Sequence, residues 1–169
     1  MPSSDAPRAG RRVVLDSNVW IDILVFDDPA ARPIRDALET GAITALIDVR
    51  CLIELERVLD YPQFKARAVD KAAALATVAR LSERVAGPER GDARAPADDA
   101  PPRPLPKCRD RDDQKFLELA YTARADWLVS KDRALLKLTR RTERDFGFRI
   151  AQPAPFAASA LAADASEPA

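Results

Sequence analysis

Apolar residues along the chain form short runs, typical of buried strands, that alternate with longer segments of helical spacing. The run Val13-Val14-Leu15 predicts a strand buried on both faces, and it continues past Asp16 into Val19-Trp20-Ile21. Three later runs predict further strands, at residues 42–47, 127–129 and 148–150.

The segments between these runs predict helices. Leu52, Leu55 and Leu59, for example, recur at helical spacing before Pro62 ends the pattern. The predicted helices span residues 29–40, 49–59, 68–87, 114–125 and 133–141, with a short one at 156–161. Strands that alternate with helices predict an α/β fold of three layers, α/β/α, with a mostly parallel central sheet of four to five strands.

One domain accounts for most of the length. We expect it to span residues 11–156, after a disordered lead-in at residues 1–10 and before a short helix and flexible tail at residues 157–169. Residues 88–107 hold six of the 14 prolines, with alanine and charged residues between them. This composition predicts a long flexible surface loop.

The composition narrows the classes of function. Lys plus Arg and Asp plus Glu both total 27, which excludes a generally basic nucleic-acid binder but allows a local basic patch. None of the 169 residues is histidine, so mechanisms that use imidazole as base, nucleophile partner or metal ligand are excluded. Any catalysis must then come from carboxylates, a metal ion, Lys, Ser or Tyr.

Cysteine usage and hydropathy indicate the compartment. Cys51 and Cys108 are far apart and have no partnered spacing, so we expect neither a disulfide framework nor a zinc site, and a cytoplasmic location fits best. No apolar stretch approaches the roughly 20 residues of a membrane helix, and the N-terminus lacks the apolar core of a signal peptide.

Two aspartates follow predicted strands. Asp16 closes the apolar run in RRVVLDSN, and Asp132 closes the one in DWLVSKD. In open α/β sheets ligands bind outside the carboxyl ends of the strands, so both side chains are candidates for one pocket. Each also has a local explanation, because Asp16 can form a turn or cap a helix, and Asp132 can cap the next helix in competition with Ser130.

Two further acids could complete a pocket of four carboxylates, a set of hard oxygen ligands that suits Mg²⁺ or Mn²⁺. Among Asp110, Asp112 and Asp113, the last is favoured because it stands immediately before the apolar face of the next helix, although such acids also suit a solvated helix start. Glu54 and Glu56 lie about 200° apart around a helix, so only one can face the site. Periodicity does not choose between them, and either can equally be a surface residue paired with a neighbouring arginine.

Five motifs carry a resemblance to a known family, namely VVLDSNVW, IELERVLDYPQF, RDRDDQKFLELA, ADWLVSKDRALL and FRIAQPAPF. Over about residues 11–156 the chain resembles the PIN domain, specifically the subgroup that holds toxin components of toxin–antitoxin systems. The resemblance implies that the four acidic positions are Asp16, Glu54, Asp113 and Asp132, which selects Glu54 over Glu56. The sequence departs from the family pattern in the long loop before Cys108 and at Arg111, where a proline is frequent.

The resemblance implies a metal-dependent ribonuclease. The four acids would be the catalytic residues and the ligands of Mg²⁺ or Mn²⁺, and Asn18 and Ser130 would orient ligands or the scissile phosphate from outside the coordination shell. The resemblance also implies an RNA substrate, a small cognate antitoxin that covers the site, and a homodimer.

A local excess of basic residues is compatible with RNA binding. Between Arg103 and Arg149 there are 13 basic and eight acidic residues. Lys137, Arg141 and Arg144 are predicted to fall along one helical face, where they would follow a line of phosphates. An ordinary solvated face explains the same three residues equally well.

Two other functions stay open. Phosphatases of the haloacid dehalogenase type also have an aspartate at the end of their first strand. Their motif is Asp-x-Asp, however, whereas this chain has Asn18 in place of the second aspartate. A non-catalytic metal-binding or RNA-binding module could use the same fold, because function is carried by sites rather than by folds.

Overall fold

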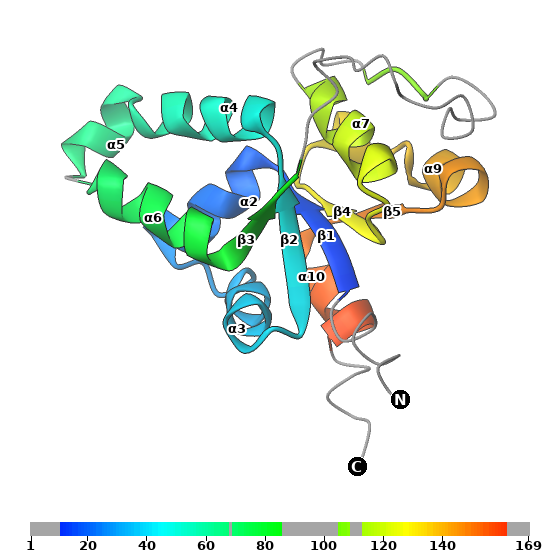
Figure 1. Ribbon diagram of the computed structural model, residues 1–169, viewed down its shortest axis with the longest axis horizontal. Helices are drawn as coiled ribbons and strands as arrows, with labels where there is room; N and C mark the ends of the chain where they lie inside the picture. The colour runs from blue at the N-terminus through cyan, green and yellow to red at the C-terminus, as the bar shows by residue number, and fades with distance from the viewer. Residues whose placement is uncertain (1–10, 68, 86–104, 109–112, 162–169) are drawn as a thin grey trace.

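Five parallel strands form the centre of the fold (Figure 1). The computed structural model describes residues 11–67, 69–85, 105–108 and 113–161. The strands are β1 (Arg11–Leu15), β2 (Ile43–Ile47), β3 (Ser82–Arg84), β4 (Trp127–Val129) and β5 (Arg149–Ala151). The predicted three-layer α/β/α class with a parallel sheet is therefore confirmed. The predicted lead-in and nearly all of the predicted proline-rich loop lie outside the described residues.

The strand order, β3-β2-β1-β4-β5, places β1 at the point where the chain changes direction across the sheet. From β1 the chain first adds β2 and β3 on one side and later adds β4 and β5 on the other. In register, Val13 of β1 lies opposite Ala45 of β2 and Trp127 of β4. The carboxyl ends of β1 and β4 are thus neighbours at a topological switch point, where α/β sheets characteristically bind ligands.

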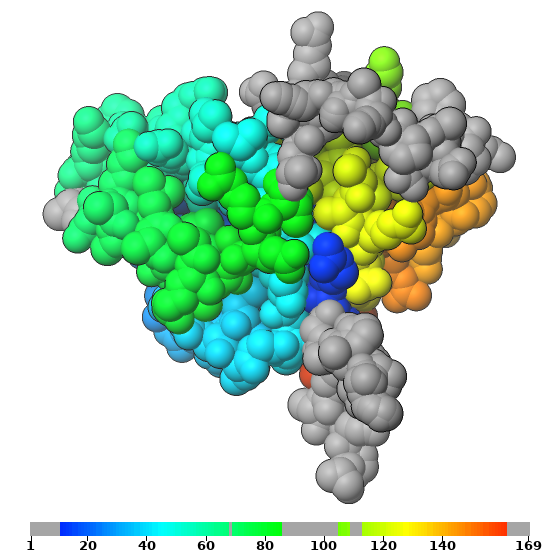
Figure 2. Space-filling view, viewed as in Figure 1, coloured from blue at the N-terminus to red at the C-terminus, as the bar shows by residue number. Residues whose placement is uncertain are grey.

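Helices connect and cover the strands (Figure 1). Their bounds are α2 (Ser17–Ile21), the π-helical turn η1 (Asp22–Phe26), α3 (Arg32–Thr40), α4 (Val49–Leu59), α5 (Pro62–Ala66), α6 (Lys71–Leu81), α7 (Gln114–Thr122), α8 (Arg133–Leu136), α9 (Thr139–Phe146), α10 (Pro153–Phe156) and a second π-helical turn, η5 (Ala157–Leu161). Helices α4, α5 and α6 gather on the side of β3, whereas α7 and α9 lie on the side of β4 and β5. Figure 2 shows these two groups on either side of the beginning of β1, in dark blue. Within the described residues, no helix has the length and apolar character needed to cross a membrane.

The core lies between the sheet and its helices. Val13 and Val14 of β1 and Leu128 of β4 have no solvent exposure, and neither do Leu55 of α4 and Leu117 of α7. Each fully buried side chain of this size contributes roughly 1.5–3 kcal/mol to folding. The apolar residues at helical spacing in α4 and α7 are therefore what hold these helices, and the acids they carry, against the sheet.

The expected continuation of the first strand through residues 19–21 is wrong. These residues belong to α2, because Asp16 ends the strand by capping a helix. Its side chain accepts a hydrogen bond from the Val19 amide at 3.2 Å, and its own backbone stays extended. Local capping thus overrides the strand propensity of a Val-Trp-Ile segment.

The predicted helix over residues 68–87 is too long at both ends. Asp70 caps α6 by accepting a hydrogen bond from the Ala73 amide at 3.0 Å, so the helix begins at Lys71. It ends at Leu81, and the next three residues form the edge strand β3, in which Ser82 lies opposite Ala45 of β2. Pairing supplies hydrogen-bond partners to the β2 backbone, a long-range requirement that helical periodicity does not register.

The predicted helix over residues 133–141 is two helices. Helix α8 ends at Leu136, and α9 begins at Thr139, whose hydroxyl accepts a hydrogen bond from the Ile150 amide at 2.8 Å. Helix α9 continues to Phe146, where Gly147 takes the left-handed conformation (φ 86°) that favours glycine at a helix end. The last strand is displaced by one residue from its predicted start, and the first long helix begins at Arg32 rather than at residue 29.

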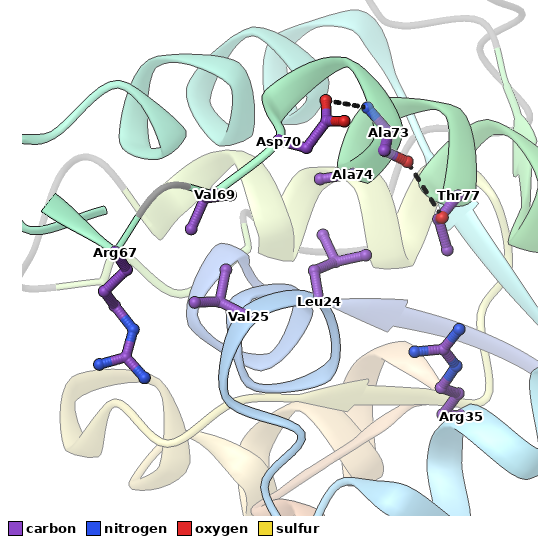
Figure 3. A pocket seen from close by; sticks show the side chains of 9 residues that line it. All are labelled: Leu24, Val25, Arg35, Arg67, Val69, Asp70, Ala73, Ala74 and Thr77. Carbon is purple, nitrogen blue, oxygen red and sulfur yellow. Dashed lines mark hydrogen bonds between the residues drawn. The ribbon is translucent and has the colours of Figure 1, made fainter. Parts of the chain in front are cut away.

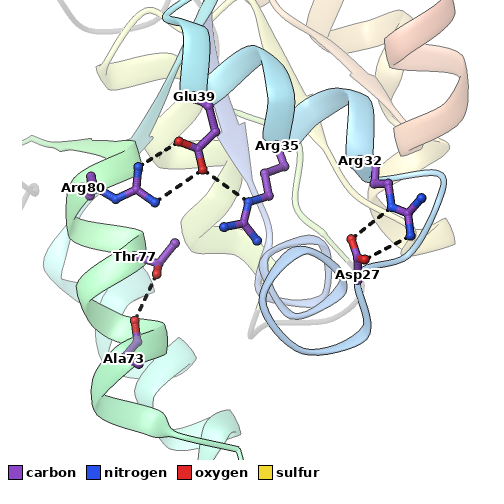
Figure 4. Close-up of polar contacts among 7 residues, drawn as sticks. All are labelled: Asp27, Arg32, Arg35, Glu39, Ala73, Thr77 and Arg80. Carbon is purple, nitrogen blue, oxygen red and sulfur yellow. Dashed lines mark hydrogen bonds and ion pairs between the residues drawn. The ribbon is translucent and has the colours of Figure 1, made fainter.

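A cavity of about 600 Å³ lies between η1, α3 and α6, with Leu24, Val25 and Ala74 in its wall and with Arg35 and Arg67 at opposite ends (Figure 3). One ion pair ties α3 to α6 beside it, because Glu39 of α3 contacts Arg80 of α6 at 2.8 Å; Glu39 also contacts Arg35 on its own helix at 3.4 Å (Figure 4). Exposed pairs of this kind contribute little stability. Neither Asp16 nor Asp132 lines this cavity, so it is separate from the carboxyl ends of β1 and β4.

Candidate metal centre at the strand ends

Asp16 is a buried carboxylate at the end of β1. Its side chain caps α2, and its other oxygen accepts a hydrogen bond from the hydroxyl of Ser130. The residue is only 3% exposed, and burial raises its pKa from an ordinary 3.8 to about 6. The Ser130 hydroxyl and the Val19 amide pull the pKa down, whereas the nearby charge of Asp132 pushes it up. Asp16 therefore carries a charge that its surroundings only partly compensate.

Ser130 joins the ends of β1 and β4. It follows β4 directly, is fully buried, and its amide donates to the Ala151 carbonyl of β5 at 2.9 Å. Its hydroxyl donates to Asp16 and accepts a hydrogen bond from the Asp132 amide at 2.9 Å. One hydroxyl thus sets the distance between the two strand-end aspartates.

Asp132 connects this pair to Asp113. One oxygen of Asp132 caps α8 by accepting from the Ala134 amide at 2.8 Å. A hydrogen bond with the Asp113 carboxyl group lowers the pKa of Asp132, against the opposing effect of partial burial. The two acids therefore lie close enough to repel each other when both are ionised.

Glu54 approaches the same region from α4. Its side chain, 22% exposed, forms an ion pair with Lys115 in the first turn of α7, two residues after Asp113. Glu56 lies elsewhere on the helix and contacts Lys71 of α6 at 4.0 Å. The structure thus distinguishes two glutamates that periodicity could not, because Glu54 is the one that faces α7.

The other predicted residues are more dispersed. The backbone amide of Asn18 contacts the Asp16 carboxylate, but the Asn18 side chain is exposed. Lys137, Arg141 and Arg144 are all exposed, yet the break between α8 and α9 means that they do not share one helical face as predicted. Arg144 is also paired with Asp145 at 3.1 Å. Asp110 and Asp112 lie outside the described residues.

A model described as PIN domain matches residues 12–134, which is more than half of the chain and includes all four acids. The chain belongs to the PIN domain family. PIN domains are generally nucleases, and they generally use divalent metal ions. A comparison with curated proteins gave no match.

The side chains of this PIN domain suit a divalent cation by their chemistry. Asp16, Asp113 and Asp132 present carboxylate oxygens, and a cation would offset both the cost of a buried charge on Asp16 and the repulsion between Asp113 and Asp132. Within the described residues, however, no three acidic side chains are already grouped as metal ligands. The Glu54 oxygen contacts an ammonium group instead.

The PIN domain holds buried acids beside this site that the sequence reasoning missed. Asp48 follows β2 as Asp16 follows β1, so the rule of acids at strand ends would have found it. It is fully buried, caps α4 through the Cys51 amide at 3.0 Å and contacts Arg50 at 3.2 Å. Arg50 also contacts Glu118 of α7 at 2.6 Å, so these charges join α4 to α7. Asp48 therefore supports the elements that carry Glu54.

A second missed acid is Asp22, at the start of η1. It is buried, and its carboxylate contacts the Lys131 ammonium at 2.6 Å. Lys131 stands between Ser130 and Asp132, so this pair fixes η1 against the loop that carries both. No local pattern connects residues so far apart in the sequence, and only the neighbouring positions of β1 and β4 bring them together.

Proposed function

We propose that this PIN domain is a metal-dependent ribonuclease, in which Asp16, Glu54, Asp113 and Asp132 hold Mg²⁺ or Mn²⁺ and carry out RNA hydrolysis. The observation that carries the proposal is the chain of contacts from the buried Asp16 through Ser130 to Asp132 and on to Asp113. The chain contains no histidine, so carboxylates are the groups left to hold a hard cation.

The protein's own contribution is to fix these oxygens in place. A divalent ion bound there supplies a water of lowered pKa and stabilises the charge that develops on the phosphate. Ser130 and the Val19 amide orient Asp16, and the Ala134 amide orients Asp132. Each of these acids keeps its geometry through a helix cap, so its local role and its proposed role are compatible.

RNA is the proposed substrate because of the family resemblance and the basic residues that follow Asp132. Three basic side chains that follow β4 in the sequence are exposed, namely Lys137, Arg141 and Arg144. They are therefore available to contact phosphates of a bound RNA. The exposed side chain of Asn18, at the start of α2, is proposed to orient the scissile phosphate. Lys137 and Arg141 are the stronger candidates, since Arg144 already has a carboxylate partner.

The proposal extends to a role as the toxin of a bacterial toxin–antitoxin system, with a cognate antitoxin, a homodimer and a cytoplasmic location. The motifs named above support this, and an adjacent reading frame for a small protein would add support. Co-expression with that small protein should yield a complex that no longer cleaves RNA. A neighbour that neither binds nor inhibits would contradict the toxin role but leave the nuclease in place.

Cleavage of labelled oligonucleotides tests the activity. We expect wild-type protein with Mn²⁺ to cleave a panel of single-stranded and structured RNAs, to lose this activity in EDTA, and to leave DNA of the same sequences intact. Asp16→Asn and Asp132→Asn, purified in parallel, are expected to be inactive. Cleavage that both substitutions leave unchanged would indicate a contaminant and overturn the proposal.

A further inference from the structure

Lys115 is a partly buried cation directly beside the proposed metal ligands. Its side chain is only 16% exposed, and its ammonium contacts an oxygen of Glu54 that is itself shielded from solvent. The same ammonium lies 5.1 Å from the centre of the Phe116 ring. A lysine is rarely buried to this extent without a carboxylate partner, so the pair holds both side chains in place.

Glu54 differs from Asp16 and Asp132 in the kind of group that its carboxylate contacts. Asp16 is held by uncharged donors, the Ser130 hydroxyl and the Val19 amide, and Asp132 likewise accepts a hydrogen bond from the Ala134 amide. Glu54 instead contacts a full positive charge. An ammonium group and a divalent cation are both attracted to a carboxylate oxygen, and one oxygen cannot be in close contact with both without bringing two like charges together.

The chemistry of lysine allows exchange. Its ammonium is a compact point charge on a flexible stem of four carbons, so it can leave one carboxylate without displacing the helix that carries it. It stands in the first turn of α7, and Glu54 stands in the middle of α4, two helices that pack against each other. Withdrawal of the ammonium would free the Glu54 oxygen while both backbones stay in position.

We propose that Lys115 is an internal counter-ion that occupies Glu54 in the metal-free protein and competes with the divalent cation for it. The inference rests on the proposed function, since it takes Glu54 to be a metal ligand. Lys115 is then a positioning residue that stabilises the empty site and weakens metal binding, so that Glu54 completes the coordination only when the ammonium withdraws.

Calorimetric titration of Mn²⁺ into the full chain tests this. Lys115→Met keeps most of the aliphatic stem but removes the charge, and we expect it to lower the Kd for Mn²⁺ by at least about fivefold, the lower end of typical coupling between two ligands. Lys115→Arg, which keeps a positive charge, should bind Mn²⁺ about as weakly as wild type. If the role of Lys115 is purely structural, Lys115→Met should leave the Kd for Mn²⁺ unchanged or raise it.

Two controls separate competition at Glu54 from the general loss of a positive charge. Lys131→Met removes a neighbouring ammonium whose partner is Asp22, and it should change the Kd for Mn²⁺ by less than Lys115→Met does. In a Glu54→Gln background, Lys115→Met should have no effect, because no carboxylate remains to be freed. Equal tightening by Lys131→Met, or tightening that persists without Glu54, would overturn the inference.

Thermal unfolding gives a second readout that does not depend on activity. In EDTA, Lys115→Met should melt below wild type, because it leaves Glu54 without its counter-ion, and saturating Mn²⁺ should raise its Tm by more than it raises that of wild type. Lys71→Met, on α6, removes the ion pair that Lys71 forms with Asp60 at 2.8 Å. Mn²⁺ should raise the Tm of this variant by no more than it raises that of wild type. An equal or smaller rise for Lys115→Met would contradict competition.

Asp16→Asn distinguishes failure of this inference from failure of the proposed function. If Asp16→Asn binds Mn²⁺ as wild type does, or if no variant binds it, the proposed site is wrong and the competition falls with it. If Asp16→Asn loses binding while Lys115→Met binds no more tightly than wild type, the metal site stands and only the role of Lys115 is overturned.

Discussion

The hydroxyl of Ser130 donates a hydrogen bond to the buried carboxylate of Asp16, and this bond joins the ends of two neighbouring strands. The same oxygen accepts the amide of Asp132 at 2.9 Å. Sheet topology brings the two aspartates to the same edge, but the serine determines how they are oriented to each other. The position of a cation at this edge would therefore depend on a neutral side chain as well as on the acids.

Replacing Ser130 with alanine should destabilise the protein. The change removes a donor to a buried carboxylate and the acceptor of a backbone amide, so we expect the free energy of unfolding to fall by about 1–3 kcal/mol. Urea denaturation at pH 7 measures it. Ser159→Ala, at an exposed position of η5, should change the same quantity by less than about 0.5 kcal/mol. Equal stability of Ser130→Ala and wild type would show that the hydrogen bond is not formed.

Stability in the absence of metal should depend on pH through Asp16. Burial raises its pKa from 3.8 to about 6, so between these values the folded protein retains a proton that the unfolded chain has released. The contribution is complete below pH 4, is lost as the pH rises through 6, and amounts to roughly 2–3 kcal/mol. Urea denaturation in EDTA from pH 4 to 8 measures this fall. Asp16→Asn cannot ionise, and a fall of the same size in that variant would assign the effect to another group.

Lys131→Met should destabilise the loop that carries the site. The substitution leaves the buried Asp22 without the ammonium that contacts it at 2.6 Å. Because the Lys131 side chain is 43% exposed, we expect a loss of about 1–2 kcal/mol rather than the larger cost of breaking a fully buried pair. Adding Asp22→Asn should recover part of the loss in a double-mutant cycle. Additive losses would show that the two residues do not interact.

Charge reversal at Lys137 and Arg141 should weaken RNA binding. Both side chains are exposed, and removing one cation that binds a phosphate should reduce the slope of log K against log salt by about 0.7 for single-stranded RNA. Fluorescence anisotropy with the inactive Asp16→Asn protein, at several salt concentrations, gives the slope. Lys65→Glu, on α5, is the matched reversal and should change it less. An unchanged affinity would assign Lys137 and Arg141 to an ordinary solvated surface.

Much of the fold could be predicted because its signals are local. Leu55 and Leu59 recur at helical spacing and are buried on α4, and the run Trp127-Leu128-Val129 is β4 as expected. The misses involve residues whose structure depends on distant partners. Ser82–Arg84 is polar and continues a helical pattern, yet it becomes a strand because β2 needs a neighbour.

The candidate site divides in the same way. Asp16 and Asp132 can be recognised in the sequence because each ends an apolar run. Both also cap helices, as their local explanation predicted. The partners that set their charge are not visible. Lys115 and Glu54 lie on separate helices, and their contact follows only from how α4 and α7 pack beside the sheet. Sequence therefore indicates which oxygens could serve as ligands but not what neutralises them.

The most direct test of the account is the single-turnover rate of Mn²⁺-dependent RNA cleavage in four variants, each lacking one carboxylate. Asp16→Asn, Glu54→Gln, Asp113→Asn and Asp132→Asn should each lower the rate on the order of 100-fold or more. Glu56→Gln, on the same helix as Glu54, should stay within about twofold of wild type. Near-wild-type cleavage by any of the four would remove that acid from the site, and near-wild-type cleavage by Asp16→Asn would contradict the account as a whole.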